Sequence, residues 1–237
     1  MRKKILISGG DGKFAKQLFS CGCDIFEISK PSRKNMNISS PRDIYSNIVR
    51  FNPDYFIHAA AMTRPMKNHE IAPMKSMKIN IEGTCNVVEA CCTTGIKLIY
   101  ISTDYVYPGR DGNYSEDDGV LPFTKYGWSK LGGECAVKMY EKSLILRIAM
   151  CEKPFPHPAA MIDVKKSSIF NDDAAKITLQ LLDEVGIINI GGPNQSIYDF
   201  VSSHQDVDSM TRNRADSSMM PDVSMNTEKL DEISRRR

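Results

Sequence analysis

Residues 4–18 read KILISGGDGKFAKQL, an apolar run followed by a glycine-rich segment and a stretch with helical spacing. A short apolar run bounded by glycine is typical of a buried strand. Glycine lets the backbone turn tightly and approach a pyrophosphate, whose charge is met by backbone N–H groups at the start of the next helix. The order G-x-x-G-x-x-A therefore predicts a dinucleotide-binding turn rather than a plain strand-to-helix turn. The residues expected to contact the cofactor here are Gly9, Gly12, Lys13, Phe14 and Ala15.

Strands and helices are expected to alternate along the rest of the chain. This alternation predicts an α/β fold with a Rossmann-like, doubly wound parallel sheet, which binds ligands at the carboxyl ends of its strands. After residue 200 the pattern weakens, and we expect partly mobile loops with a short helix from Thr227. Apolar runs predict strands at 24–29, 55–61, 98–102, 143–148 and within 186–192, and amphipathic spacing predicts helices from 40, at 74–93, at 126–140 and at 172–182.

Two parts are expected in the chain. Residues 1–148 would form an NADP-binding Rossmann domain that carries the catalytic residues. Residues 149–237 would form a small C-terminal substrate lobe, interleaved with the last sheet elements and ending in a polar tail.

Composition excludes several classes of protein. The chain has 237 residues, of which 41% are hydrophobic and 25% charged, as in an ordinary globular protein. Its net charge of +2 is spread along the sequence, so we expect no nucleic-acid partner. Apolar runs are too short for an export signal or a membrane span, which predicts a cytoplasmic protein that makes no membrane contact. Seven cysteines without C-x-x-C spacing and four scattered histidines predict reduced thiols and no metal site.

The segment after the second predicted strand bears on the choice of dinucleotide. An acidic residue there would bind the adenosine ribose of NAD, but the chain has Ser29, Lys30 and Arg33. Hydroxyls and cations suit a 2′-phosphate, so NADP is favoured over NAD. A basic surface loop is the alternative, and Glu27 could still reach the ribose. Asn37 would either contact the adenine or serve as a turn residue.

Tyr126 and Lys130 are separated by one helical turn. Residues four apart share a helix face, so this spacing alone often arises by chance. The pair gains meaning from its context, since it follows a glycine-rich turn and a strand that ends in Ser102-Thr103-Asp104.

Together these motifs resemble the extended short-chain dehydrogenase/reductase superfamily, and within it the dTDP-4-dehydrorhamnose reductase family. The likeness covers most of the chain, so coincidence is a poor explanation. The segments that carry it are HAAAMT (58–63), INIEGTCNVVEAC (79–91), LIYISTDYVYPG (98–109), YSEDD (114–118) and YGWSKLGGE (126–134).

The resemblance implies an NADPH-dependent reduction of the C4 ketone of a nucleotide-linked 4-keto-6-deoxy sugar. Tyr126 would donate the proton, and Lys130 would stabilise the phenolate and hold the nicotinamide ribose. Thr103 would hydrogen-bond the substrate carbonyl, with the adjacent Ser102 as the alternative. Ala59, Ala60 and Ala61 are expected to line the cofactor site.

Three alternatives are weighed within this likeness. Tyr105 stands where nucleotide-sugar dehydratases tend to carry glutamate, which argues against dehydration. A 4-epimerase would use the same Tyr and Lys with a retained NAD, and the basic loop weighs against it. The segment between Arg147 and Phe170 is shorter than in the family, which admits a non-catalytic NADP-binding regulatory subunit resembling the methionine adenosyltransferase β-subunit. A pocket filled by Phe155 or His157 would favour that subunit.

Two further expectations stay open at this point. Asn80 would either join the active-site hydrogen bonds or cap or kink the long helix. A homodimer is expected by analogy alone.

Overall fold

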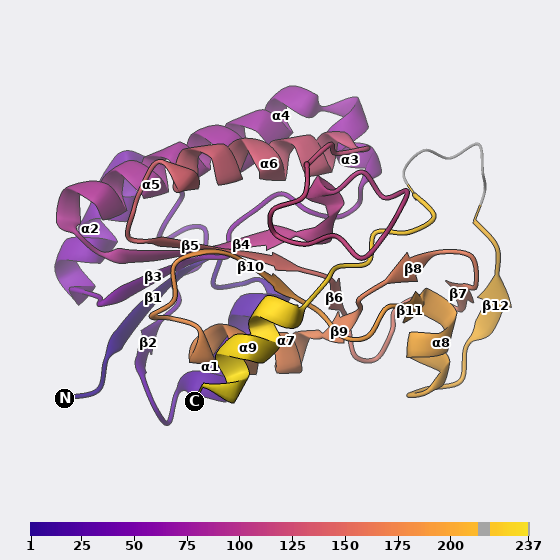
Figure 1. The fold of residues 1–237 in the computed structure, drawn as a ribbon. Helices are drawn as coiled ribbons and strands as arrows, with labels where there is room; N and C mark the ends of the chain where they lie inside the picture. The colour runs from indigo at the N-terminus through magenta and orange to yellow at the C-terminus, as the bar shows by residue number, and fades with distance from the viewer. Residues whose placement is uncertain (213–218, 237) are drawn as a thin grey trace.

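A six-stranded parallel sheet forms the centre of the computed structural model, which describes residues 1–212 and 219–236 (Figure 1). Its order is β10-β5-β4-β3-β1-β2, with β2 on one side of β1 and β3 on the other, so the topological switch point lies between β1 and β3. This order confirms the predicted doubly wound fold. The strands are β1 (Lys4–Ser8), β2 (Glu27–Ser29), β3 (Tyr55–His58), β4 (Lys97–Thr103), β5 (Ser143–Ile148) and β10 (Gly186–Ile190).

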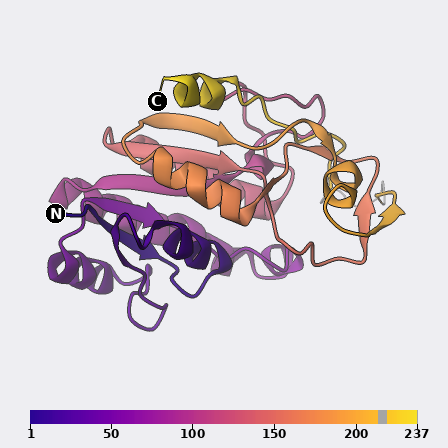
Figure 2. The ribbon, with the colours of Figure 1, turned by 90° about the horizontal axis from the view of Figure 1, so that it is seen from below.

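Helices cover both faces of this sheet, so its central strands are apolar on both sides. One face packs against α2 (Pro41–Phe51), α5 (Gly83–Thr94) and α6 (Lys125–Lys138). On the other face, seen in Figure 2, lie α1 (Lys13–Gly22), α7 (Asn171–Gln180) and α9 (Glu228–Arg235).

A small lobe extends beyond the carboxyl ends of the strands (Figure 1). We call it the substrate lobe and define it as residues 150–170 and 195–212. A ligand bound at the carboxyl ends of the strands would therefore contact this lobe. The lobe contains β6 (Met150–Cys151), β7 (Ala159–Met161), β8 (Lys165–Lys166), β9 (Ile169–Phe170), β11 (Gln195–Ser196), α8 (Ile197–Ser202) and β12 (Asp208–Met210).

The helix predicted over residues 74–93 is not continuous. It consists of α4 (Pro73–Met77), a π-helical turn η1 (Lys78–Glu82) and α5, preceded by the short α3 (Lys67–Ile71). A π turn inserts one extra residue per turn and so rotates the side chains that follow it. Here it places Asn80 in the interior, with only 1% of its surface exposed.

The chain after residue 200 contains more regular structure than the expected loops. Its residues 208–210 pair with β7 as a parallel strand, and α9 forms where a short helix was predicted. The expected mobility concerns in part residues 213–218, which lie outside the described residues.

Buried charges join α6 to the sheet. The carboxylate of Glu134 pairs with the Arg147 guanidinium at 2.9 Å and accepts a hydrogen bond from Ser102 at 2.5 Å. Arg147 also donates to the Tyr107 hydroxyl at 2.8 Å. Because every charged oxygen and nitrogen here has a partner, the pair is tolerated in the core, which agrees with a structural role for Arg147.

Gly10, which the sequence pattern passes over, is the glycine with least room in the turn. A Cβ there would lie 2.1 Å from the Lys30 carbonyl oxygen and 2.6 Å from that of Pro31. We predict that Gly10→Ala lowers the free energy of unfolding by about 1–3 kcal/mol, because backbone atoms cannot yield as a side-chain tip can. Denaturant unfolding measures this. Gly119→Ala is the control, since a Cβ at Gly119 meets nothing within 4 Å; equal effects of the two changes would contradict the packing account.

Candidate active site

A cleft of about 530 Å³ runs along the carboxyl ends of β1, β3, β4 and β5. Its floor is the glycine-rich turn, where Gly9 has a φ of +75° and a Cβ would lie 2.8 Å from the Cα of Ala60. The cleft therefore requires glycine at this position. The predicted residues that line it are Gly9, Gly12, Lys13, Phe14, Ala15, Ala59, Ala61, Thr103, Tyr126 and Lys130.

Helix α1 opens directly onto this cleft. Its N-cap is Gly12, which has no side chain to accept hydrogen bonds from the first turn. The unpaired N–H groups at a helix start, together with the helix dipole, attract an anion. The turn thus has the geometry that a pyrophosphate needs.

A second recess of about 320 Å³ continues the cleft past the glycine turn. Arg33, Asn37 and Ala60, three of the residues expected to contact the cofactor, line it. Ser29 and Lys30 line neither cavity; the Lys30 ammonium lies 5.4 Å from the ring centre of Phe19 on α1.

Asp11 also lines this recess, and its carboxylate accepts a hydrogen bond from the Arg33 backbone N–H at 3.3 Å. The sequence pattern did not single it out, because the glycine motif leaves that position free.

Tyr126 lies in the first turn of α6, one residue after the helix begins. The side chain of Thr124 caps the helix by accepting from the Gly127 N–H at 3.0 Å, which fixes the entry of the chain. The Tyr126 ring lies 5.1 Å from that of His69 and 6.0 Å from that of Tyr105, both edge-to-face.

Burial raises the pKa of Tyr126 well above that of a free phenol, and the nearby carboxylate of Asp104 raises it further. A hydrogen bond with Thr103 and the charge of Arg64 act in the opposite direction. In this state the phenol holds its proton at neutral pH, as a proton donor must.

Lys130 follows one turn later on α6 and is 2% exposed. Its ammonium lies 4.0 Å from the ring centre of Tyr100, and burial lowers its pKa to about 7 although Glu134 opposes the shift. The stabilisation of a Tyr126 phenolate by Lys130 stays a prediction, since the largest charge effects on the phenol come from other groups.

The hydroxyl of Thr103 accepts from the Tyr105 N–H at 3.3 Å and donates to Asp104 Oδ1 at 3.0 Å. Ser102, the alternative contact for a carbonyl, donates its hydrogen to Glu134. Each of these hydroxyls donates its hydrogen to a carboxylate and both residues line the cleft, so the choice of Thr103 over Ser102 stays a prediction.

A chain of hydrogen bonds begins beneath the glycine turn. The Ser8 hydroxyl accepts from the Ala60 N–H at 3.2 Å and bonds His58 Nδ1 at 2.8 Å, and His58 Nε2 bonds the Thr84 hydroxyl at 3.0 Å. Thr84 donates to the Asn80 carbonyl, so it accepts from His58. The imidazole is therefore neutral with its proton on Nε2, and burial lowers its pKa to about 3.

Asn80 extends these bonds to α6. Its amide nitrogen donates to the Ser129 hydroxyl at 2.8 Å, and Ser129 donates to the Tyr126 carbonyl at 2.8 Å. The Asn80 side chain also bonds both the N–H and the carbonyl of Met62. Asn80 thus takes part in a hydrogen-bonded network and also lies in the π turn that interrupts the long helix. We call the set Ser8, His58, Thr84, Asn80 and Ser129 the polar relay.

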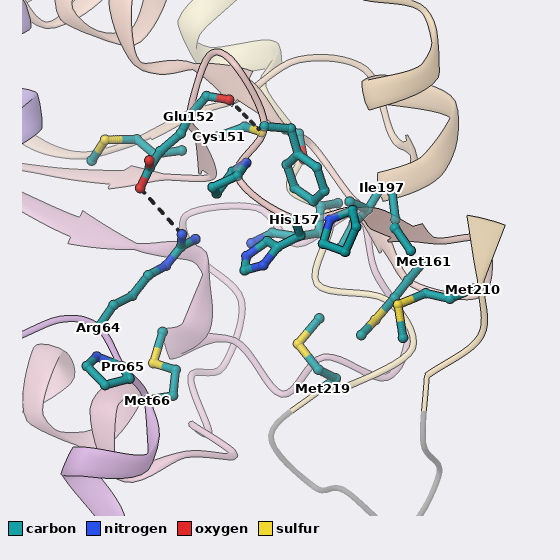
Figure 3. A pocket seen from close by; sticks show the side chains of 18 of the residues that line it. Arg64, Pro65, Met66, Cys151, Glu152, His157, Met161, Ile197, Met210 and Met219 are labelled. Atoms are coloured by element: carbon teal, nitrogen blue, oxygen red, sulfur yellow. Dashed lines mark hydrogen bonds and ion pairs between the residues drawn. The ribbon is translucent and has the colours of Figure 1, made fainter. Parts of the chain in front are cut away.

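A cavity of about 720 Å³ lies between the cleft and the substrate lobe (Figure 3). Phe155 and His157 form part of its wall and do not fill it. Methionines also line it, and Met161 lies opposite Met210 in the β7–β12 pair. Residues shared with the cofactor cleft are Arg64, Met66, Tyr105, Met150, Glu152 and Lys166.

Glu152 spans the cleft at this junction. Its carboxylate pairs with the Lys13 ammonium on α1. It also pairs, at 3.5 Å, with the Arg64 guanidinium (Figure 3). Lys13 therefore lines the predicted site, and its ammonium is paired with the carboxylate of Glu152.

In residues 1–212 and 219–236, the structure places no group of three or more His, Cys, Asp or Glu side chains that could share a metal ion. None of the helices in that described part is long and apolar enough to cross a membrane.

The neutral His58 makes stability depend on pH. Its folded pKa of about 3 lies below the ordinary 6.5, so the unfolded chain takes up a proton first as the pH falls through this window. The folded state should lose about 2 kcal/mol between pH 6.5 and 5 from this group. We predict that His58→Gln flattens the decline of the unfolding free energy over that range, measured by denaturant titration. His157→Gln, at an exposed position, should leave the decline unchanged; an unaltered decline in His58→Gln would refute the account.

Comparisons with known proteins agree with this geometry. The methionine adenosyltransferase 2 subunit beta of Bos taurus is 30% identical over 146 residues, which are 57% of this chain and 42% of that protein. The dTDP-4-dehydrorhamnose reductase of Aggregatibacter actinomycetemcomitans is 30% identical over 148 residues, 61% of this chain and 50% of that protein. The chain thus spans about half the length of the curated relatives it matches.

Among solved structures, a dTDP-4-dehydrorhamnose reductase from Bacillus anthracis in complex with NADP has the same fold, with a TM-score of 0.86. The likeness covers 98% of this chain and 92% of that one at 22% identity. The family described as RmlD substrate binding domain matches residues 2–151. Since that match takes in more than half of the sequence, this chain belongs to the RmlD substrate binding domain family.

Proposed function

We propose that this protein reduces the C4 ketone of a nucleotide-linked 4-keto-6-deoxy sugar with NADPH. The observation that carries the proposal is the position of Tyr126, a buried phenol beside Thr103 in a cleft that opens into a second, 720 Å³ cavity. A reductase needs this adjacency, because cofactor and ketone must meet at one proton donor.

Each group in the cleft has a role in this reaction. The dinucleotide would supply the hydride when bound, with its pyrophosphate at the start of α1. Thr103 would orient the ketone beside Tyr126, whose phenol gives its proton to the forming alkoxide. Lys130 would hold the nicotinamide ribose. These assignments of Thr103, Tyr126 and Lys130 are proposals from the sequence motifs and the geometry.

The likeness to both curated relatives supports the proposal only in part, since the chain spans about half of each. A 4-epimerase with retained NAD and a non-catalytic subunit are the competing functions. Both predict no net oxidation of NADPH, and so one assay separates them from the reductase.

Tyr126→Phe is the first test. We predict that kcat for NADPH oxidation with nucleotide-linked 4-keto-6-deoxy sugars falls by roughly 10²–10⁴, because no other group replaces the proton donor. NADPH affinity should stay unchanged, as measured by cofactor fluorescence. Trp128→Phe is the matched control, since that side chain lies on the same helix but is 50% exposed. Bound NADPH without turnover in the unmodified protein would favour the non-catalytic subunit.

We propose that Arg33 makes the protein prefer NADP to NAD. Arg33 lines both the adenosine recess and a shallow depression shared with Asp11, Ser32, Lys34 and Asn37. A 2′-phosphate placed there would meet a guanidinium, whose planar donors bind phosphate well.

We predict that Arg33→Ala weakens NADPH binding by roughly 10- to 100-fold, as expected for lost hydrogen bonds to a charged group. Binding of NADH should change little, because it has no 2′-phosphate. Titration of cofactor fluorescence measures both. Lys30→Ala is the control, since Lys30 lies against Phe19 and lines neither cavity. If Arg33→Ala weakened the binding of NADPH and NADH equally, Arg33 would not be the cause of the preference for NADP.

A further inference from the structure

Lys166 enters the candidate active site from the substrate lobe. Its ammonium forms an ion pair with Asp104 Oδ2 at 2.8 Å, and the two side chains are only 12% and 2% exposed. Asp104 follows directly after Thr103 and begins the 3₁₀ turn η2 (Asp104–Val106). A buried pair of this kind links the lobe to the end of β4.

The two carboxylate oxygens of Asp104 have different partners. Oδ2 faces Lys166, and Oδ1 accepts the hydrogen of the Thr103 hydroxyl at 3.0 Å. Thr103 and Tyr126 line the same cleft. Lys166, Asp104 and Thr103 are therefore connected in one sequence of contacts that ends beside Tyr126, and we call it the lobe connection.

Backbone pairing holds Lys166 in place. Strand β8 pairs with β11, and the N–H and carbonyl of the neighbouring Lys165 bond Pro221 and Val223. The Lys166 ammonium also lies 4.8 Å from the ring centre of Tyr105, whose π face contacts it. Lys166 lines both the cleft and the larger cavity.

The charges around Tyr126 show what Lys166 contributes. The groups that face the phenol are Asp104 and Tyr105 from η2, Arg64 from the segment after β3, Thr103 from β4 and His69 from α3, with Lys130 one turn along its own helix. Asp104 is the one carboxylate among these, and it opposes ionisation of the phenol. Lys166 neutralises that carboxylate and so limits its effect.

We propose that Lys166 is a positioning residue for the reduction, because it holds Asp104 so that Asp104 fixes the Thr103 hydroxyl beside Tyr126. This rests on the proposed function. The substrate lobe then does more than shape a pocket, since it completes the arrangement of polar groups at the proton donor.

The test is a double-mutant cycle with Lys166→Met, Asp104→Asn and the two together, assayed for NADPH oxidation with nucleotide-linked 4-keto-6-deoxy sugars. Lys166→Met leaves a buried carboxylate unpaired, so kcat should fall by roughly 10²-fold, the effect of misplaced reacting groups. The double variant should recover part of this loss, because an amide needs no counter-charge. Lys166→Arg should retain most of the activity. Lys165→Met, an exposed neighbour on β8, is the matched control.

A second readout separates positioning from support of the fold. In the reverse reaction Tyr126 accepts a proton, so kcat rises with pH as the phenol ionises. Lys166→Met should move that rise to higher pH and the double variant should move it back, while NADPH affinity stays unchanged. A purely structural Lys166 would lower thermal stability and leave the pH profile in place.

The outcomes are distinguishable. If the unmodified protein turns over no such sugar, the proposed function fails and the role of Lys166 fails with it. If it is active and Lys166→Met has the same kcat and pH profile, only the role of Lys166 is overturned. Should Lys166→Met not fold, loss of activity in Lys166→Arg together with full activity in Asp104→Asn would overturn it equally.

Discussion

The polar relay is the constraint on which the rest of the site depends. It passes through the ends of β1 and β3, the π turn η1 and helix α6, and each of its donors has an acceptor. Buried polar groups are costly when unpaired, so a shift in any one of these elements would leave several groups unsatisfied. The glycine turn and the Tyr126 backbone are thus held in one mutual arrangement, which a rigid hydride-transfer site requires.

The parts that the sequence predicts are those with local causes. An apolar run bounded by glycine is enough to predict β1, and the Thr124 cap with the helical spacing after it is enough to predict α6. The π turn has no such local signal. It places the Asn80 side chain where it bonds Met62 and Ser129, which are distant from it in the sequence. Lys166 likewise reaches Asp104 only through the pairing of β8 in another lobe. Gly10 could have been found, since a second glycine beside Gly9 allows a close approach.

The ion pairs in the cleft differ in how easily a ligand can replace them. The Lys13–Glu152 and Arg64–Glu152 pairs join side chains that are 75%, 55% and 24% exposed, so water screens them and they contribute little to stability. A pyrophosphate at the start of α1 can compete for those cations. The Glu134–Arg147 pair, at 4% exposure on each side, cannot be opened without leaving a buried charge. The protein therefore keeps fixed charges under α6 and exchangeable charges at the mouth of the cleft.

The cavity beside the substrate lobe differs from this fixed centre. Methionine side chains, which are flexible and polarizable, form part of its lining and can fill irregular space around ligands of different shape. Precision at the proton donor must then come from elsewhere. The polar relay holds the Tyr126 backbone from the sheet side, and the lobe connection holds Thr103 from the side of the substrate lobe. The proposed proton donor thus lies in a fixed arrangement next to a cavity with adaptable walls.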